Sequence, residues 1–383
     1  MISDMTPILA FCESQREWLT ETIEALACLE SPTTDKAAVD RCGVELERRL
    51  LMMGARITRL RQAAAGDHLR AEFGEGTDQL LVLGHFDTVW PVGQVARMPV
   101  VRAGGRLHGP GTFDMKGGIG IAMLGVRALR EAGPGLGCRI VLLLTTDEET
   151  GSATSRPVIE EEARRSLAAL VFEPALPGGA VKTSRKGCGE FTVSVRGIAA
   201  HAGIEPGQGA NAIHELAEQI LALERLQDPE RGASVNVDIV RGGTRTNVIA
   251  EEAHAEVDVR VVSREDAARL EAAIRGLQPR RKGTVLSVAG GIGRPPLERT
   301  AGVVRLYEIA RGVAGELGID LAEGGTGGGS DGNFSAALGV PTLDGLGAVG
   351  DGAHALHEHV ELESLCRRAA LAAGLMAQVS KIG

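Results

Sequence analysis

The feature that most constrains the fold is an alternation of short apolar segments with amphipathic ones in the first half of the chain. The apolar segments are residues 78–86, 138–149 and 167–174, and residues 115–133 and 155–165 between them have helical spacing. Strands that are apolar along their whole length are typical of a sheet covered on both faces. The alternation therefore predicts an α/β fold with a mostly parallel sheet sandwiched by helices.

The pattern changes after Lys182. Residues 190–197 (EFTVSVRG) alternate strictly, as a half-exposed strand does, and they open a β-α-β-β-α-β order that predicts a ferredoxin-like α+β domain. From Pro295 onward the alternation of helical and strand patterns seen in the first half of the chain returns. We therefore expect one large domain formed by residues 1–185 and 295–383, with a smaller domain, residues 186–294, inserted into it.

Composition excludes several classes of partner. The net charge is −9 and no basic run occurs, which argues against nucleic acid and against attraction to anionic lipid. No segment approaches ~18 uninterrupted apolar residues, so no membrane span is expected, and the N-terminus does not resemble a secretory signal. The six cysteines are scattered without a C-x-x-C pair, which indicates reduced thiols and favours a cytoplasmic location.

Polar side chains follow the predicted strands at the places where ligands of open α/β sheets bind. These residues are His85 and Asp87, then Glu148 and Glu149, then Glu173, together with Asp114 before a helix and His354, His357, Glu358 and His359 near the C-terminus. Several imidazoles and carboxylates on one rim are typical of a metal site. Mixed nitrogen and oxygen ligands without thiolates suit catalytic zinc, and cobalt or manganese suit the same ligands.

Each of these motifs also has a purely structural interpretation. His85 and Asp87 point to the same face of a strand, so Asp87 could orient a ligand imidazole or form a satisfied pair with it. Glu148 and Glu149 point in different directions, so one could bind a metal while the other takes a proton from water. Alternatively the two form an acidic helix N-terminus, and the histidine-rich segment near the C-terminus is a solvated loop.

Eight motifs together carry a family resemblance. From about residue 80 to 360 they read GHFDTVWPVG, GPGTFDMKGG, TTDEETGS, FEP, GIAAHAG, GGTRTNVI, GGGSD and GAHALHE. They resemble the successive motifs of the dizinc family of acetylornithine deacetylase, succinyl-diaminopimelate desuccinylase, aminoacylase and glutamate carboxypeptidase. The resemblance implies a zinc-peptidase-like catalytic domain, an inserted lid and dimerisation domain, two zinc ions and a homodimer.

The resemblance also implies a metal-ligand set. In the family pattern His85 and Glu173 share one ion, Glu149 and His354 share the other, and Asp114 bridges both. The peptide bond after the bridging aspartate is commonly cis in such relatives.

Further roles come from the same resemblance. Glu148 becomes the general base, and Asp87 becomes the partner that orients the metal-binding imidazole. His201 of GIAAHAG corresponds to the histidine that stabilises the oxyanion, from its own subunit or from the partner subunit. Asn247 of TRTNVI corresponds to a substrate contact. The structural alternative for His201 is a capping residue beside two alanines.

A free substrate carboxylate needs cationic or amide donors. Arg260 and Arg294 could grip it bidentately, and Gly328 in GGGSD offers close-packed backbone amides. Surface arginines and a flexible turn are the structural alternatives.

Within the family, several motifs are most similar to the glutamate carboxypeptidase branch, which releases C-terminal glutamate from folate-like or N-acyl substrates. The secreted members of that branch carry a signal peptide, which is not seen here, and GAHALHEHV resembles other branches. An N-acyl-amino-acid deacylase is therefore the alternative. A non-catalytic binding protein would be expected to lack Glu148 or a ligand, and this sequence has them all.

Overall fold

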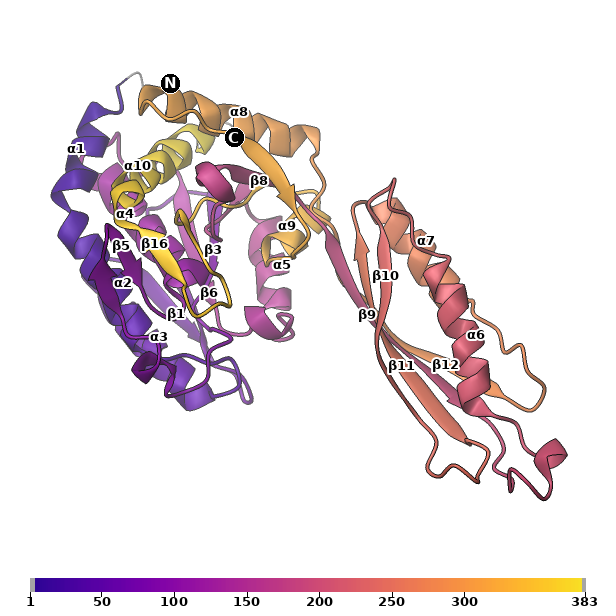
Figure 1. Cartoon of the computed structure of the whole chain (residues 1–383). Helices are drawn as coiled ribbons and strands as arrows, with labels where there is room; N and C mark the ends of the chain where they lie inside the picture. The colour runs from indigo at the N-terminus through magenta and orange to yellow at the C-terminus, as the bar shows by residue number, and fades with distance from the viewer. Residues whose placement is uncertain (1–3, 381–383) are drawn as a thin grey trace. The chain divides into compact units, whose positions relative to one another are not determined.

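The computed structural model describes residues 4–380 and divides into two compact units (Figure 1). The larger unit comprises the chain up to Ser184, then Glu298–Gly325, and then the chain from Ser330 onward. The smaller unit comprises Arg185–Leu297 and Thr326–Gly329. We describe each unit by itself.

The larger unit is built on a six-stranded sheet in the order β1-β2-β6-β3-β7-β14. The strands are β1 (Arg56–Leu60), β2 (His68–Phe73), β3 (Gln79–His85), β6 (Arg139–Thr145), β7 (Ala168–Val171) and β14 (Thr342–Leu343). Strands β6, β3, β7 and β14 are parallel, whereas β2 runs antiparallel to β6 and β1 runs antiparallel to β2. The expected mostly parallel sheet is confirmed, and the antiparallel pair at one edge is an addition that the sequence pattern did not predict.

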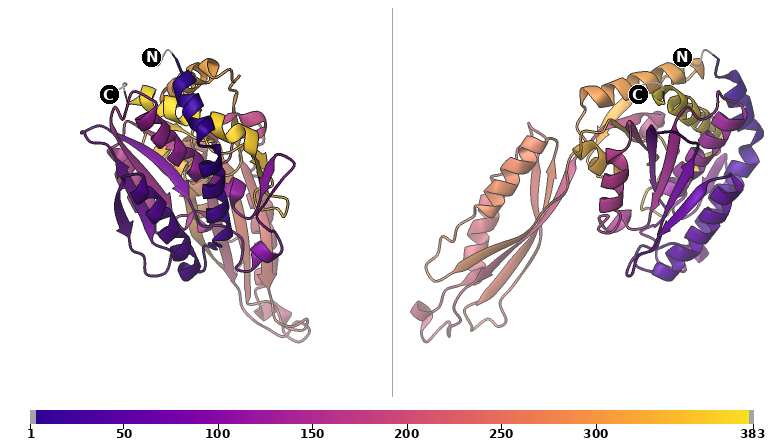
Figure 2. Two further views of the ribbon diagram at one scale, coloured as in Figure 1. Left: turned by 90° about the vertical axis from the view of Figure 1, so that its left-hand side faces the viewer. Right: turned by 180° about the vertical axis from the view of Figure 1, so that it is seen from behind.

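Helices cover both faces of this sheet (Figure 2). They are α1 (Thr6–Ser14), α2 (Arg16–Cys28), α3 (Lys36–Met52), α4 (Gly117–Glu131), α5 (Arg156–Arg164), α8 (Ala301–Glu316), α9 (Gly332–Ala337) and α10 (Leu362–Val379). Successive residues of β3 show why the strand is apolar throughout. Leu80 and Val82 belong to one hydrophobic core, while Leu81 and Leu83 belong to another.

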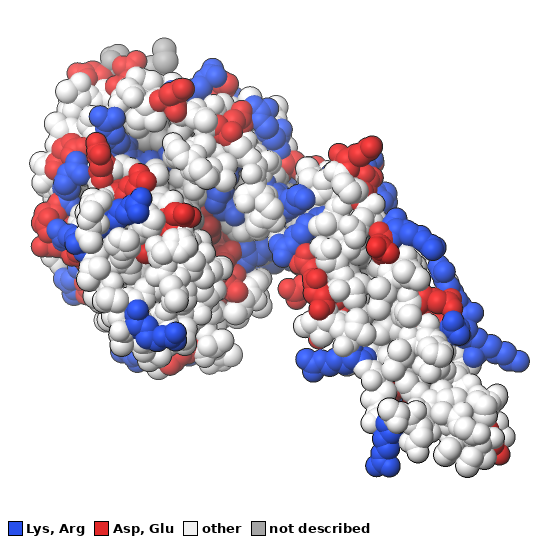
Figure 3. Space-filling model, in the orientation of Figure 1, with Lys and Arg blue, Asp and Glu red and all other residues white. Residues whose placement is uncertain are grey.

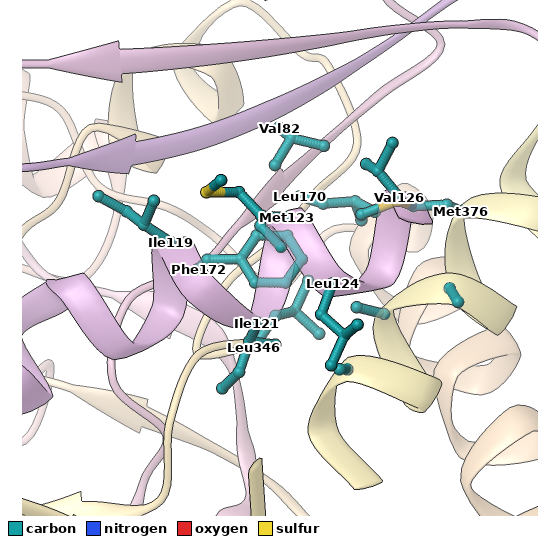
Figure 4. Packing of buried hydrophobic residues seen from close by; sticks show 14 of the residues in the cluster. Val82, Ile119, Ile121, Met123, Leu124, Val126, Leu170, Phe172, Leu346 and Met376 are labelled. Carbon is teal, nitrogen blue, oxygen red and sulfur yellow. The ribbon is translucent and has the colours of Figure 1, made fainter. Parts of the chain in front are cut away.

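The larger of these two cores is centred on α4. Figure 4 shows side chains of this helix, among them Ile121 and Leu124, packed with Leu170, Phe172 and Met376 from β7, the segment after it and α10. Every residue named here is at most 1% exposed. This packing holds α4, whose first residues belong to the GPGTFDMKGG motif.

Shorter elements complete the larger unit. A small sheet joins β15 (Gly350–Asp351), β16 (His359–Glu361), β5 (Arg106–His108) and β4 (Val101–Ala103) in that order, and β8 (Val181–Arg185) pairs with β13 (Glu323–Thr326). Short turns occur at η1 (Gln94–Ala96), η2 (Thr112–Lys116), η3 (Glu148–Thr150) and η4 (Pro177–Gly179), and the backbone of η2 is not helical at Asp114 and Met115. Because β16 pairs with β5, the C-terminal histidine-rich segment lies beside the GPGTFDMKGG motif.

The smaller unit has the ferredoxin-like order. Its elements are β9 (Gly187–Arg196), η5 (Pro206–Gln208), α6 (Ala212–Glu224), β10 (Ser234–Gly242), β11 (Glu252–Val261), α7 (Arg264–Arg275) and β12 (Val285–Arg294). The four strands form an antiparallel sheet in the order β10-β11-β9-β12. Alternate residues of β9 (Phe191, Val193 and Val195) enter the core with Leu216 of α6 and Leu270 of α7. The ferredoxin-like expectation is confirmed.

Two surface properties bear on partners. Basic and acidic side chains are interspersed over the face shown in Figure 3, which agrees with a net charge of −9 and no basic run. Among the helices of residues 4–380, none has the length and apolar character that crossing a membrane requires.

Candidate active site

A cluster of imidazole and carboxylate side chains lies at the carboxyl ends of the parallel strands. His85 is the last residue of β3, the turn η3 follows β6, and Glu173 follows β7. Parallel strands end at the same edge of a sheet, so these positions converge although they are far apart in the chain. His85 is 2% exposed and Glu173 is 7% exposed, which places both inside the larger unit.

One half of the cluster is centred on His85. Its Nε2 lies 3.3 Å from Asp114 Oδ1 and 3.5 Å from Glu173 Oε1. The other half is centred on His354, whose Nε2 lies 3.4 Å from Asp114 Oδ2 and 3.2 Å from Glu149 Oε2. The two oxygens of Asp114 therefore face two different imidazoles, and each imidazole has one further carboxylate of its own.

Glu148 lies beside the first half of the cluster. It offers an oxygen that, with His85 and Glu173, forms a group of potential ligand atoms within 4.8 Å of one another. A second such group comprises His85, Asp114 and Glu149. Both glutamates of the TTDEETGS motif thus reach the cluster, and the turn η3 directs them to different parts of it.

The backbone around Asp114 is closely constrained. The Asp114–Met115 peptide bond is cis, as the family resemblance implies. Gly111, where the turn starts, has φ +71, and a Cβ there would lie 2.7 Å from Cγ2 of Thr88. Glycine is needed at this position both for the left-handed conformation and for the close approach. His354 also has a positive φ, 59°, which is uncommon for a residue with a side chain and marks a closely defined loop.

Asp87 holds the other side of the His85 ring. The Nδ1 of His85 lies 3.1 Å from the backbone oxygen of Asp87 and 3.4 Å from its Oδ1. Asp87 is fully buried, and its Oδ2 accepts hydrogen bonds from Thr33 Oγ1 at 2.8 Å and from the backbone N–H of Glu149 at 3.3 Å. The Nδ1 side of the His85 ring is thus occupied by the oxygens of Asp87. This orientation of the ring leaves Nε2 facing Asp114 and Glu173.

The carboxylates dominate the pKa values of the cluster. Burial lowers the pKa of His85, but Asp114, Asp87 and Glu173 outweigh it and hold that pKa well above 6.5. Hydrogen bonds that His354 donates to the carboxylates of Asp114 and Glu149 raise its pKa to about 10. Burial raises the pKa of Glu149. The raised pKa values of the two imidazoles indicate a negative environment in which a positive charge is stabilised.

The donor set fits a divalent cation. The cluster brings together five carboxyl groups (Asp87, Asp114, Glu148, Glu149 and Glu173) and two imidazoles (His85 and His354), so its acidic groups outnumber its basic ones. Within residues 4–380, the buried oxygens Asp87 Oδ1, Asp114 Oδ1 and Glu149 Oε1 have no hydrogen-bond partner. Buried carboxylate oxygens are costly unless they are hydrogen-bonded or coordinate a metal.

A polar network supports η3. Oδ2 of Asp147 accepts hydrogen bonds from the backbone N–H of Thr154 at 2.6 Å and from its Oγ1 at 2.7 Å. Asp331 accepts from Thr145 Oγ1 at 2.8 Å and from Ser152 Oγ at 2.5 Å. The sequence favours at most an orienting role for Asp331 in GGGSD and gives no signal for Asp147.

The smaller unit carries the remaining candidates, beginning with His201 and Asn247. The backbone N–H of Ala202 donates to the oxygen of Asn247 at 3.0 Å, so the two candidate residues lie in neighbouring backbone segments. Nδ1 of His201 accepts hydrogen bonds from the backbone N–H groups of Gly203 and Ile204, at 3.1 and 3.2 Å. In the neutral imidazole the proton is therefore on Nε2, which makes the exposed end of the ring a hydrogen-bond donor.

The two candidate arginines differ in their surroundings. Arg260 donates to Asp258 Oδ1 and Oδ2 and lies against Cys188 Sγ at 2.6 Å, so an acidic neighbour already pairs with its guanidinium. Arg294 is 9% exposed, and its Cδ lies 3.1 Å from where a Cβ on Gly329 would be.

Gly328 presents its carbonyl to a third arginine. Arg185 Nη1 lies 3.2 Å from the oxygen of Gly328 and 2.9 Å from that of Gly329. Arg185 was not singled out from the sequence, where an arginine at the end of a strand gives no specific signal.

Residues 81–378 match Peptidase family M20/M25/M40 over most of the chain. The chain belongs to this family. It is 32% identical over 370 residues to carboxypeptidase G2 of Pseudomonas sp. (strain RS-16), covering 93% of this chain and 88% of that protein. It is 30% identical over 335 residues to succinyl-diaminopimelate desuccinylase of Xanthomonas euvesicatoria pv. vesicatoria (strain 85-10). This match covers 80% of this chain and 88% of that protein. The predicted family and the prediction of a hydrolytic enzyme are confirmed.

Solved structures agree with this M20 assignment at the level of the fold. Aminopeptidase PepT from Bacillus cereus superposes with a TM-score of 0.80 at 21% identity, covering 96% of this chain and 99% of that one. The YXEP protein from Bacillus subtilis is described as a dinuclear metal binding peptidase from the M20 family. It superposes with a TM-score of 0.66 at 16% identity, covering 96% of this chain and 99% of that one.

Proposed function

We propose that this M20 chain is a dizinc hydrolase that cleaves an amide bond next to a free carboxylate. The substrate class we infer is an N-acyl or folate-like compound with a C-terminal glutamate, which the enzyme releases. The likeness to carboxypeptidase G2 supports this class, because that relative matches over 93% of the chain.

The observation that carries the dinuclear proposal is the position of Asp114. Its Oδ1 faces His85 and its Oδ2 faces His354, at 3.3 and 3.4 Å. A carboxylate that offers one oxygen to each of two donor sets is the arrangement expected of a bridge between two ions ~3.5–4 Å apart. We propose His85 and Glu173 as ligands of one ion, Glu149 and His354 as ligands of the other, and Asp114 as the ligand of both.

In the proposed reaction, Glu148 accepts a proton from the attacking water and donates it to the leaving nitrogen. Two bound divalent cations would supply Lewis acidity, polarising the scissile carbonyl and making water a better nucleophile. Asp87 keeps His85 in one tautomer and one orientation, so the donor set is formed before substrate arrives. Mixed imidazole and carboxylate ligands favour zinc, and cobalt or manganese would fit the same residues.

For the oxyanion and the substrate carboxylate we propose donors from the smaller unit. His201 from one of the two subunits would donate from Nε2 to the oxyanion, in keeping with the hydrogen bonds that its Nδ1 accepts. Asn247, Arg294, Arg260 and the backbone at Gly328 are the proposed substrate contacts. Arg260 would have to leave Asp258 or be shared with it.

An N-acyl-amino-acid deacylase is the second candidate. The 30% identity to succinyl-diaminopimelate desuccinylase favours it, since the same hydrolytic groups serve both reactions and only the recognised side of the amide differs. A panel of N-acyl glutamates, a folate-type glutamate conjugate, acetylornithine, succinyl-diaminopimelate and dipeptides, assayed with zinc, cobalt or manganese, separates the two. Release of glutamate as the fastest reaction supports the first proposal. Faster deacylation of the diamino acids would replace it with the second.

We also propose a cytoplasmic homodimer that forms through the smaller unit. The six cysteines are all free thiols. The edge strand β10 exposes Ile239 and Val240, at 39% and 53%, and an apolar exposed edge is suited to pairing with another chain. Light scattering of the purified chain would give twice the monomer mass if the dimer forms.

A further inference from the structure

Glu358 is a buried carboxylate for which the proposed reaction has no use. It is 1% exposed and directly precedes β16. Among residues 4–380, the groups of potential metal ligands do not include it. A buried carboxylate is costly unless its oxygens are fully engaged, so its hydrogen bonds indicate what it does.

Four N–H donors converge on this carboxylate. Oε1 accepts from the backbone N–H of Phe113 at 2.9 Å and of Asp114 at 3.0 Å. Oε2 accepts from the backbone N–H of Gly111 at 2.9 Å and from Trp90 Nε1 at 2.9 Å. A carboxylate has about four acceptor positions, and all four are occupied here.

The three backbone donors belong to the turn that carries Asp114. They lie in the segment before α4, which begins at Gly117, so they are not part of that helix's own hydrogen-bond pattern. A side chain 244–247 residues away in sequence satisfies them, and one of the three is the amide of Asp114 itself. Glu358 therefore holds the backbone from which the Asp114 carboxylate projects.

Glu358 is equally tied to the loop of His354. The backbone N–H of Glu358 donates to the oxygen of Ala355 at 3.0 Å, and that of Ala355 donates to Gly352 at 2.8 Å. The loop is tight, since a Cβ on Gly352 (φ +83) would lie 2.9 Å from the backbone of Glu358. One residue thus connects the two segments whose side chains meet at 3.4 Å, between His354 Nε2 and Asp114 Oδ2.

We propose that Glu358 is a positioning residue that fixes the shared carboxylate of Asp114 against His354, and that Trp90 reports its state. This inference rests on the proposed dinuclear site. Since Trp90 donates to the same oxygen as Gly111, a change in the Asp114 turn on metal binding reaches the indole through a single carboxylate. The chain has two tryptophans, so Trp18→Phe leaves Trp90 as the sole indole fluorophore.

The test variant is Glu358→Gln in the Trp18→Phe background. Glutamine keeps one acceptor oxygen and turns an NH₂ group toward two N–H donors, so two of the four hydrogen bonds are lost without a change in size. Partners that orient metal ligands are typically worth about 10–100-fold in metal affinity. We expect zinc affinity, measured by competition with a chelating dye, to fall by that factor, and Trp90 fluorescence to lose its response to zinc.

The control is Glu361→Gln, an exposed glutamate at the end of β16, the strand that follows Glu358. It should bind zinc with unchanged affinity and keep the fluorescence response. The absorption spectrum of the cobalt-loaded proteins provides a second measurement, which a loss of stability alone would not change. We expect the visible absorption bands of bound cobalt to shift in Glu358→Gln and not in Glu361→Gln, and excess metal to restore part of kcat.

The outcomes separate this inference from the proposed function. If the unsubstituted chain binds fewer than two divalent ions, the dinuclear proposal fails. If it binds two and Glu358→Gln binds them with the same affinity and the same cobalt spectrum, the positioning role is wrong. If circular dichroism shows that Glu358→Gln does not fold, Trp90→Phe provides the test, because it removes only one of the four hydrogen bonds. A few-fold loss of zinc affinity in Trp90→Phe supports the positioning role of Glu358, and an unchanged zinc affinity overturns it.

Discussion

At the residue scale, Glu148 and Glu149 show how two adjacent carboxylates acquire different proposed tasks. Glu149 Oε2 lies 3.2 Å from His354 Nε2, and burial raises its pKa. Glu148 is half-buried and groups with His85 and Glu173 on the other side of the cluster. One is enclosed by ligand-type partners and the other stands at the border of the cluster, where a proton acceptor has access to water and substrate.

The first prediction concerns this proton acceptor. Glu148→Gln removes the basic oxygen and keeps the shape of the side chain, so kcat should fall by about 10²–10⁴-fold, the usual contribution of a general base. Metal content, measured by mass spectrometry of the desalted protein, should stay at the unsubstituted value. Glu161→Gln, an exposed glutamate of α5, is the matched control. A variant that retains turnover would refute the role of Glu148.

The second prediction concerns His201. Replacing it with Ala removes the Nε2–H donor and should lower kcat by about 10²–10³-fold with little change in KM, because the oxyanion exists only in the transition state. His214→Ala, an exposed histidine on α6 of the same unit, should leave both constants unchanged. A rise in KM alone after the His201 substitution would instead indicate a substrate contact.

At the element scale, a buried carboxylate joins α5 to the sheet in addition to the apolar contacts of Ile159 and Ala163. Glu162, 4% exposed, accepts from Arg70 Nε of β2 at 2.8 Å and from Gln79 Nε2 of β3 at 2.8 Å. Burial raises the pKa of Glu162, but Arg70 and Gln79 outweigh it and the net pKa lies below 4.5. A depressed folded-state pKa stabilises the protein above the unfolded value, and the contribution is lost as pH falls through the folded value.

The third prediction follows from the lowered pKa of Glu162 in the folded state. Glu162→Gln should lower the free energy of unfolding by about 1–3 kcal/mol at pH 7, and the difference from the unsubstituted chain should shrink as pH falls below 4.5. Urea titrations at pH 7 and pH 4 measure it. Glu161→Gln, whose exposed side chain pairs with Arg165, should change stability by less than about 0.5 kcal/mol at either pH. A penalty that is equal at both pH values would show that the charge of Glu162 is unimportant.

The same scale shows what the sequence could predict. Strands β3, β6 and β7 were predictable because both faces are buried, which leaves a continuous apolar run. Strands β1 and β2 were not, since β1 is half-exposed and β2 mixes His68, Arg70 and Glu72 with apolar residues. These charged residues are tolerated in the sheet because Arg70 pairs with Glu72 and Glu162, a compensation that only the fold makes visible.

The residues of the site divide in a similar way. His85, Asp114, Glu149, Glu173 and His354 stand at strand ends or in motifs, so their convergence could be anticipated from the parallel sheet and from the family resemblance. Glu358 was visible only as one polar residue in a histidine-rich segment. Its role depends on amides 244–247 residues away, and no local pattern encodes a partner at that distance.

At the scale of the whole molecule, the proposed metal site lies within one of two compact units. The carboxylates of the cluster belong to the larger unit, and they repel one another unless a cation is bound. Bound zinc should therefore stabilise the larger unit and have little effect on the stability of the ferredoxin-like unit. Ligand binding to the folded state alone stabilises by about 2.7 kcal/mol when its concentration is 100 times Kd. The apparent melting temperature should therefore fall on chelation and recover when zinc is added back.

The fourth prediction resolves this effect along the chain by hydrogen exchange. Removing zinc with a chelator should abolish activity and increase exchange in the segments that carry the cluster, namely residues 85–90, 111–117, 147–152 and 350–358. Exchange in α6 and α7 should change little, because their hydrogen bonds and core belong to the smaller unit. Magnesium, which prefers oxygen ligands in octahedral geometry, serves as the control cation and should restore neither activity nor protection. Increased exchange spread evenly over both units would mean that the metal stabilises the chain by some route other than the cluster around Asp114.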